Sequence, residues 1–229
     1  MISNSLILIL SSSFMAPDVK EEKIYPLGYE PETAPESTDP NVRNQLINFI
    51  LKSGPTEVVD TDLFAVMAKR RSTRKFLDKP VETAKIDKII AAADTAPTAG
   101  NYQGFEIFYV KSPEKKKQLI EACNNQPYVN APVVLVFCKN PSRVKFDFPE
   151  YVLKKFAIQD ATLAAGYSQL AAQALGLSSI WIGMFDEQKV MDVIGTDLVP
   201  SSVLCIGYPK QTKFPKPRRN LKDLVHVTW

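Results

Sequence analysis

Seven consecutive apolar residues limit the architectures open to this chain: Pro132-Val133-Val134-Leu135-Val136-Phe137-Cys138. A continuous apolar run of this kind predicts a central strand that is buried on both faces. Further apolar runs predict strands at 105–110, 179–182 and 203–206. Helical patterns separate the predicted strands, and this alternation indicates a layered α/β or α+β sheet.

The helical patterns lie at about 39–54, 60–69, 83–93, 113–123 and 149–175. From Ala161 to Leu177 the longest of them carries no charged residue. Because a helix without a solvated face should be buried all round, we expect it to form much of a two-fold interface between copies of the chain. An ordinary helix in the centre of the core is the alternative.

Length and composition favour one globular domain. The 229 residues, 45% of them hydrophobic, predict a domain over 39–229 after a proline-rich extended arm or leader over 1–38. The formal net charge of +3 is small and the basic residues are scattered along the chain, so we expect no nucleic-acid partner. No stretch reaches ~18 apolar residues, and no positive charge precedes the apolar residues 6–10, so neither a membrane span nor a signal peptide is expected.

Several kinds of chemistry are disfavoured by what the sequence contains. Its one histidine, His226, excludes a His-based metal cluster and disfavours a catalytic triad, so we expect no metal site. Cys123, Cys138 and Cys205 show no CxxC spacing, which indicates reduced structural thiols in a cytoplasmic protein. Neither GxGxxG nor GxxxxGK[ST] occurs, so a nucleotide cofactor would have to bind in another way.

A basic segment, Arg70-Arg71-Ser72-Thr73-Arg74, follows the helical pattern at 60–69. Its guanidinium groups can fork onto phosphate or carbonyl oxygens, and the Ser72 hydroxyl adds a neutral donor. The segment therefore predicts a site for an anionic cofactor. A solvated basic loop is the alternative, since short basic runs are common on surfaces.

Five segments taken together resemble the FMN-dependent nitroreductase family. They are RRSTRKF at 70–76, APTAGNYQ at 96–103, AIQD at 157–160, GLSSIWIG at 176–183 and KPRR at 216–219. The resemblance runs from about Asp62 to the C-terminus. It implies an α+β fold, an intertwined homodimer with FMN in clefts between the subunits, and hydride transfer from NADH or NADPH through FMN to nitroaromatic, quinone or similar electrophilic acceptors in a ping-pong cycle.

The resemblance also implies roles for residues at the two ends of the cofactor. At the phosphate and ribityl end it implies binding by Arg70, Arg71, Ser72, Lys216 and Arg218. At the ring end it implies a catalytic cation and a backbone donor to the flavin N5, carried here by Arg74 and Gly183. Trp181 and Ile182 would run past the ring, and Asn125 would bond to it.

The partner subunit's contribution is implied by the turn after the helix at 83–93. There, Pro97, Thr98 and Ala99 would reach FMN from the partner, supported by Asn101 and Gln103. This chain departs from the family at Gly104-Phe105, where relatives often carry Pro-Trp, and in its short 139–151 connection, where larger relatives insert lid helices.

Some alternatives stay open within the resemblance. Phe146, Phe148 and Tyr151 either stack over the flavin or act as staple and core residues at the start of the long helix. An FMN-dependent reductive dehalogenase, a flavin-fragmenting enzyme and a flavin-binding module without turnover are alternatives to the oxidoreductase.

Overall fold

The structure, a computed structural model, describes residues 62–211, 214 and 216–228. The expected arm over 1–38 and the expected helix over 39–54 lie outside these residues. None of the described helices is long and apolar enough to cross a membrane.

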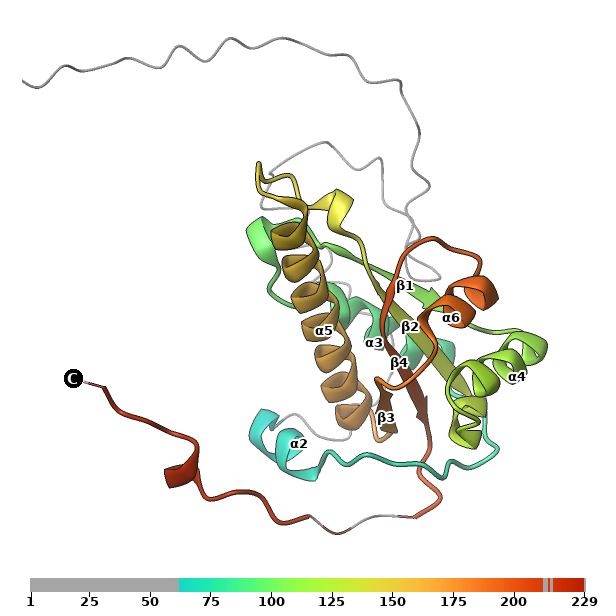
Figure 1. The fold of residues 1–229 in the computed structure, drawn as a ribbon. Coiled ribbons are helices and arrows are strands. Elements are labelled where there is room, and N and C mark those ends of the chain that lie inside the picture. Colours follow the sequence, from blue (N-terminus) through green and yellow to red (C-terminus); the bar gives the residue numbers. More distant parts are fainter. Residues whose placement is uncertain (1–61, 212–213, 215, 229) are drawn as a thin grey trace, which may run out of the picture.

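Four antiparallel strands form one sheet in the order β1-β2-β4-β3 (Figure 1). They are β1 (Phe105–Tyr109), β2 (Val133–Lys139), β3 (Ser178–Ile182) and β4 (Pro200–Gly207). The apolar run in β2 pairs with β1 on one side and with β4 on the other, so its expected central place is confirmed. Alternate β2 residues are buried on opposite faces of the sheet, which explains why the run is continuously apolar.

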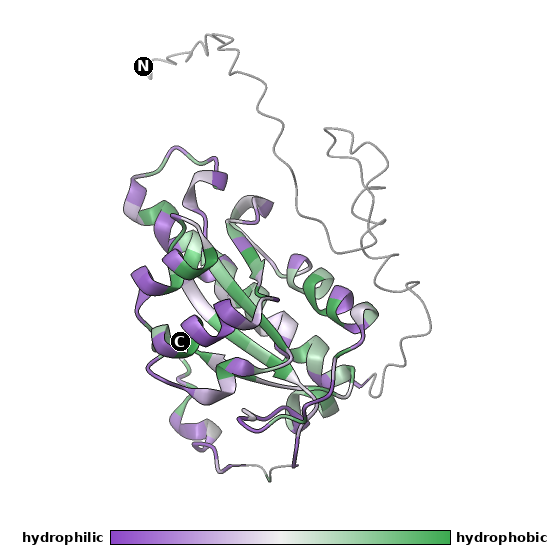
Figure 2. Cartoon of the chain, turned by 90° about the vertical axis from the view of Figure 1, so that its right-hand side faces the viewer, coloured by the Kyte–Doolittle hydropathy of each residue, from purple (hydrophilic) through white to green (hydrophobic). Residues whose placement is uncertain are grey.

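Helices cover both faces of the sheet, and the predicted α+β fold is confirmed. Helices α3 (Thr83–Asp94) and α5 (Glu150–Ala174) pack on the face that includes Val133, Leu135 and Phe137, and α4 (Pro113–Ala122) and α6 (Glu187–Ile194) pack on the other. Figure 2 shows the hydrophobic strands between helices with hydrophilic outer surfaces. The short α2 (Leu63–Lys69) lies at the C-terminal end of α5, near β3 (Figure 1).

Single helical turns complete the described architecture. They are η1 (Ala99–Asn101), η2 (Pro127–Asn130), η3 (Pro141–Arg143) and η4 (Leu221–Asp223). Helix α6 was not expected from the sequence; it follows the N-cap Asp186 and ends at Ile194, before the C-cap Gly195, whose φ of 74° is left-handed. Asp186 and Gly195 are ordinary start and stop signals for a helix. Only Val190 of this helix is buried, however.

Helix α5 is buried along one face only within a single chain. Ala161, Ala164 and Ala165 are fully buried against the sheet, whereas Leu163 is 41% and Tyr167 is 38% exposed. Residues 161–177 are therefore not buried all round within one chain, and the expected burial of their exposed side by a second copy stays a prediction. The exposed side of α5 from Ile158 onward is uncharged, which is unusual for a helix face in water.

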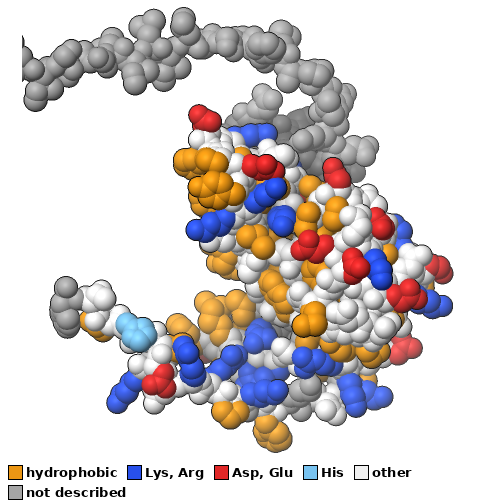
Figure 3. Space-filling view, in the orientation of Figure 1, with side chains coloured by type: hydrophobic (Ala, Val, Ile, Leu, Met, Phe, Trp, Pro, Cys, Tyr) orange, Lys and Arg blue, Asp and Glu red, His pale blue; other side chains and the backbone are white. Residues whose placement is uncertain are grey.

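A second exposed apolar area adjoins this helix face. Leu63, Phe64 and Met67 of α2 are exposed, and α2 contacts α5. Figure 3 shows apolar side chains where α2 meets the lower end of α5, beside a concentration of Lys and Arg. Exposed apolar surface of this extent is typical of a face that another protein surface covers.

Candidate functional site

The basic segment at 70–74 runs in an extended conformation along the edge strand β3. Helix α2 ends at Arg70, whose ψ of 129° turns the chain out of the helix. Ser72 then forms a parallel bridge with Ser179, and the Thr73 N–H donates to the Ser179 carbonyl at 2.9 Å. Further on, the Leu77 N–H donates to the Tyr208 carbonyl at 2.9 Å. These contacts fix the spacing of the arginine side chains along the sheet edge.

Two neighbouring arginines, Arg70 and Arg71, and the distant Arg218 form an uncompensated positive cluster. Partial burial and the charges of Arg218 and Arg71 lower the pKa of Arg70. Within the described residues, none of the three forms an ion pair with a carboxylate. Like charges held close together repel one another, and a bound anion would offset this repulsion. The cluster is therefore a candidate anion-binding site.

Arg71 donates hydrogen bonds to the C-terminal end of α2. Its Nη1 donates to the Ala68 carbonyl at 2.6 Å and to the Arg70 carbonyl at 2.7 Å, which satisfies carbonyls that the helix leaves open. Its Nε is buried and has no hydrogen-bond partner in the described structure. An anion at this position would supply the acceptor that the buried Nε lacks.

Arg74 is held against an aromatic ring. Its guanidinium carbon lies 5.8 Å from the centre of the Tyr128 ring in η2, within cation–π range. The Tyr128 hydroxyl donates to Gln126 Oε1, and Gln126 Nε2 donates to the Met184 carbonyl at 3.3 Å. This chain of contacts connects Arg74 with the loop that follows β3.

A second side chain donates to the same carbonyl of this loop. The Asn124 side-chain amide also donates to the Met184 carbonyl at 3.3 Å, from a turn in which Asn124 and Asn125 both have a φ of 56°. Gly183 is exposed, and a Cβ there would make only ordinary contacts with the Trp181 indole, at 3.5 Å and 3.9 Å. Ile182 is buried in the core on the α4 and α6 side of the sheet, so its side chain is not available at the surface.

The turn at 97–103 is held by a buried carboxylate on α5. Asp160 is 2% exposed, and its two oxygens accept from the Ala99 N–H and the Gly104 N–H, each at 3.0 Å. Thr98 Oγ1 accepts from the Gln103 N–H at 3.2 Å, and the Gln103 side chain donates to Asn101 Oδ1 at 3.0 Å. Pro97 at the tip of the turn is exposed.

An aromatic cluster packs against this turn. The Phe146 ring lies 5.2 Å from the Tyr102 ring, 5.4 Å from the Phe148 ring and 6.1 Å from the Phe156 ring, measured between centroids. Gly100 has a φ of 57°, and a Cβ there would lie 2.5 Å from Phe146. Both the left-handed backbone conformation and the ring beside it therefore favour glycine at this position. Tyr151 stays 74% exposed.

The expected site residues fall into two groups within one chain. The basic segment, Arg218 and the 181–184 loop are associated with β3 and the C-terminal end of α5, whereas the 97–103 turn is attached at Asp160. Gln169 of α5 donates to the Ser179 hydroxyl at 3.2 Å, and at 1.5 Å per residue Asp160 and Gln169 are about 14 Å apart along α5. The two groups are therefore separate within a single chain. Lys216 belongs to neither group and lies exposed on the C-terminal segment.

Three residues with defined contacts were given no role by the sequence analysis. Asp160 stood in the AIQD segment, but only its contacts with Ala99 and Gly104 reveal that it supports the turn. The resemblance named Gln126 only together with Asn125 at the flavin ring and did not include Tyr128, because the contacts of these two side chains with Met184 and Arg74 join residues that are distant in sequence. In the described residues, no group of three or more His, Cys, Asp and Glu side chains is arranged to hold a metal ion.

Comparisons with known proteins agree with the geometry. A profile of the nitroreductase family matches residues 67–130 and 122–208. The chain is 31% identical over 176 residues to a Bacillus subtilis protein named FMN reductase [NAD(P)H], covering 70% of this chain and 71% of that one. It also resembles the structure of NADPH:FMN oxidoreductase from Vibrio harveyi, with a TM-score of 0.68 at 28% identity over 73% of this chain and 77% of that chain.

A second solved structure gives the same result. Nitroreductase A from Vibrio parahaemolyticus has a TM-score of 0.68 at 29% identity, covering 73% of this chain and 75% of that chain. The matched region contains β3, the basic segment and the turn held by Asp160. The chain belongs to the nitroreductase family.

Proposed function

We propose that this protein is an FMN-dependent oxidoreductase that uses NADH or NADPH to reduce small electrophilic acceptors such as nitroaromatics and quinones. The observation that carries the proposal is the positive cluster of Arg70, Arg71 and Arg218 without a carboxylate partner in the described residues. The Bacillus subtilis relative is named an FMN reductase, and the Vibrio harveyi structure is of an NADPH:FMN oxidoreductase in complex with NAD⁺.

The residues at the β3 edge fit the phosphate end of FMN. A phosphate monoester carries about two negative charges near neutral pH, and several charge-assisted hydrogen bonds can hold it without a glycine-rich loop. In this proposal Arg70, Ser72 and Arg218 bind the phosphate and ribityl chain, Lys216 joins them from the C-terminal segment, and the buried Nε of Arg71 gains an acceptor.

The ring end would lie between Arg74 and the 181–184 loop. When bound, FMN would supply the two-electron chemistry by accepting a hydride from NAD(P)H and passing it to the acceptor. Arg74 would place its positive charge at the pyrimidine edge, where negative charge develops, and the Gly183 backbone would donate at the flavin N5. The Gln126–Tyr128 contacts would keep both groups in place.

Each complete site would need two copies of the chain. The turn at 97–103 is attached at Asp160, about 14 Å along α5 from Gln169, which contacts the β3 edge, so the turn would serve the FMN held by the partner. The uncharged exposed side of α5, with Leu163 and Tyr167, and the apolar side of α2 provide a surface that a second copy would bury. We place this homodimer in the cytoplasm because its three cysteines are buried free thiols.

Two measurements on the purified protein test the proposed function. Addition of FMN should produce flavin absorbance that stays with the protein through gel filtration and should raise its melting temperature. Anaerobic NADH or NADPH should then bleach that absorbance, and an added quinone should restore it. Absence of FMN binding would refute the proposal. Bound FMN that is inert toward both nicotinamide cofactors would instead favour a dehalogenase, a flavin-fragmenting enzyme or a binding module.

Tyr128 provides a prediction about how Arg74 is positioned. We expect Tyr128→Leu to lower the rate of flavin reduction about two- to fivefold, because it removes a cation–π contact whose typical strength at an exposed site is about 0.5–1 kcal/mol. The reduction potential of the bound FMN should become more negative, as measured by spectroelectrochemistry. Tyr128→Phe is the matched control, since it keeps the ring under Arg74 and loses only the hydroxyl. Equal potentials in Tyr128→Leu and the parent protein would contradict the positioning role.

A further inference from the structure

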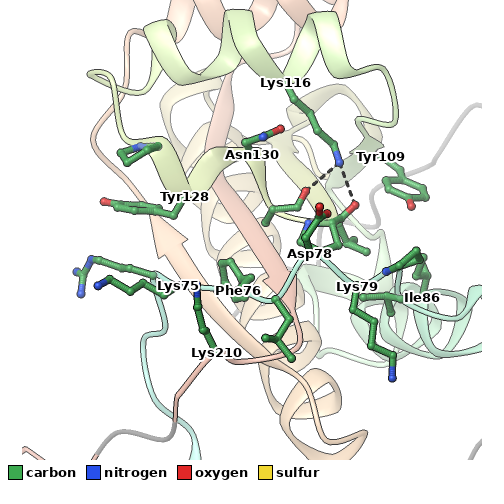
Figure 4. Close-up of a pocket in the computed structure, with 18 residues that line it drawn as sticks. Lys75, Phe76, Asp78, Lys79, Ile86, Tyr109, Lys116, Tyr128, Asn130 and Lys210 are labelled. Atoms are coloured by element: carbon green, nitrogen blue, oxygen red, sulfur yellow. Dashed lines mark hydrogen bonds between the residues drawn. The ribbon is translucent and has the colours of Figure 1, made fainter.

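A cleft of about 790 Å³ lies beside the ring end of the candidate site. The segment 74–81 and Lys210 form one wall, and the segment 127–133 and Lys116 form the other (Figure 4). Arg74 and Tyr128 belong both to this cleft and to the contacts that lead to the β3 loop. A ligand in the cleft could therefore continue into the space where the flavin ring is proposed to lie.

The charges around the cleft are strongly unbalanced. Five cationic side chains line it and only one carboxylate, Asp78, opposes them; the cations are Arg74, Lys75, Lys79, Lys116 and Lys210. Among the described residues, none of the five forms an ion pair. Lys79 is occupied elsewhere, because its Nζ lies 4.1 Å from the centre of the Tyr208 ring.

Two of the remaining cations are held side by side. The Lys210 N–H donates to the Lys75 carbonyl at 3.0 Å, so the two residues lie next to each other on neighbouring extended segments. Figure 4 shows both side chains at the same end of the cleft. Arg74 precedes Lys75 in the chain and lines the same cleft. Three adjacent positive charges without a carboxylate partner would attract a phosphate group.

Lys116 carries a buried positive charge over the middle of the cleft. The residue is 8% exposed, and its Nζ donates to the Ala131 carbonyl at 2.8 Å and to the Pro132 carbonyl at 2.9 Å. An ammonium group has three donors, so one remains, and Figure 4 shows Nζ directed into the cleft. Burial lowers the pKa of Lys116, and an anion nearby would offset this cost of burying the charge.

The cleft also offers aromatic surface. Phe76, Tyr109 and Tyr128 line it, and none of them is fully buried. Rings of this kind can stack with a purine base, while the neighbouring cations bind phosphates. The volume of the cleft lies within the range of about 300–1,000 Å³ that is usual for small-molecule sites.

We propose that this cleft binds the adenosine phosphate half of the nicotinamide dinucleotide and that it selects NADPH over NADH. The inference rests on the proposed function, because it assigns a binding site for the hydride donor. Both dinucleotides carry the pyrophosphate, but only NADPH adds a 2′-phosphate with nearly two further negative charges. Lys75, Lys210 and Lys116 together provide more positive charge than is needed to neutralise the pyrophosphate alone.

Calorimetric titration of the full-length protein with adenosine 2′,5′-bisphosphate and with AMP tests the inference without relying on activity. We expect the bisphosphate to bind at least about tenfold more tightly than AMP. The double variant Lys75→Met/Lys210→Met should abolish this difference. Lys117→Met is the matched control, because Lys117 is exposed on the same helix as Lys116 and does not line the cleft; it should bind both nucleotides like the parent protein.

Three outcomes would overturn the inference. One is equal affinity for the two nucleotides, and another is an unchanged preference in the double variant. The third is displacement of the bisphosphate by inorganic phosphate at equal concentration, which would reveal an unspecific anion site. If FMN binds and is reduced by NADPH while the bisphosphate does not bind, the cleft assignment fails and the proposed function stands. If FMN does not bind, the proposed function fails whatever the titration gives.

Discussion

Replacing Arg74 with methionine should lower the rate of flavin reduction by NAD(P)H about a hundredfold or more. Removing one preorganised electrostatic contact from a reaction centre typically costs about 2.7–4 kcal/mol of transition-state stabilisation. Arg74 is exposed and is held by the Tyr128 ring rather than by a carboxylate, so its charge is free to act on a ligand. Anaerobic stopped-flow spectroscopy at the flavin absorbance band measures this rate directly.

Two controls separate this effect from a general loss of the site. Arg74→Lys keeps a positive charge and should recover most of the rate, although without the fork geometry of a guanidinium. FMN affinity should fall much less in Arg74→Met than in Arg70→Met, because Arg70 belongs to the cluster proposed to bind the phosphate. A rate within about threefold of the parent protein in Arg74→Met would contradict a catalytic role for this residue.

Asp160→Ala should destabilise the protein by about 3 kcal/mol or more. The substitution leaves the Ala99 and Gly104 N–H groups without their acceptor, and hydrogen bonds to charged groups contribute about 1.5–3 kcal/mol each. For a domain of this size we expect the melting temperature to fall by about 6–12 °C, measured by circular dichroism. FMN affinity should also fall, because the turn at 97–103 would lose its fixed position.

Asp160→Asn is the conservative comparison, since its amide oxygen can still accept one hydrogen bond. It should lose less stability than Asp160→Ala. Asp147→Ala, at an exposed loop position, removes the same charge and should change the melting temperature little. A melting temperature for Asp160→Ala close to that of Asp147→Ala would contradict the supporting role of the buried carboxylate.

Periodicity and apolar runs predicted most of the described fold. The β2 run is unambiguous because both faces of the central strand are buried, and α5 is long enough for its pattern to be clear. Helix α6 was missed because it has eight residues and only one of them is buried. Strand β4 begins at Pro200 rather than at 203, since pairing with β2 extends it beyond its apolar run.

The candidate site could be predicted only as a set of residues. The sequence placed a positive cluster after α2, but the pairing of Ser72 with Ser179 and the proximity of Arg218 to Arg70 depend on tertiary contacts. The same holds for Asp160, whose spacing in α5 does not reveal that it holds a turn some sixty residues earlier in the chain. The separation of the site into two groups along α5 likewise requires the folded chain. The roles given to individual residues stay predictions.

We propose that each FMN site combines the basic segment of one copy with the 97–103 turn of the other. A heterodimer of two inactive variants tests it most directly, with Arg70→Glu/Arg74→Glu in one chain and Ala99→Trp in the other, purified through two different tags. If the sites are shared, one site contains both lesions and the other contains none, so the heterodimer should bind one FMN per two chains while each homodimer binds none. A heterodimer that binds no FMN would contradict the account, because each site would then lie within a single chain.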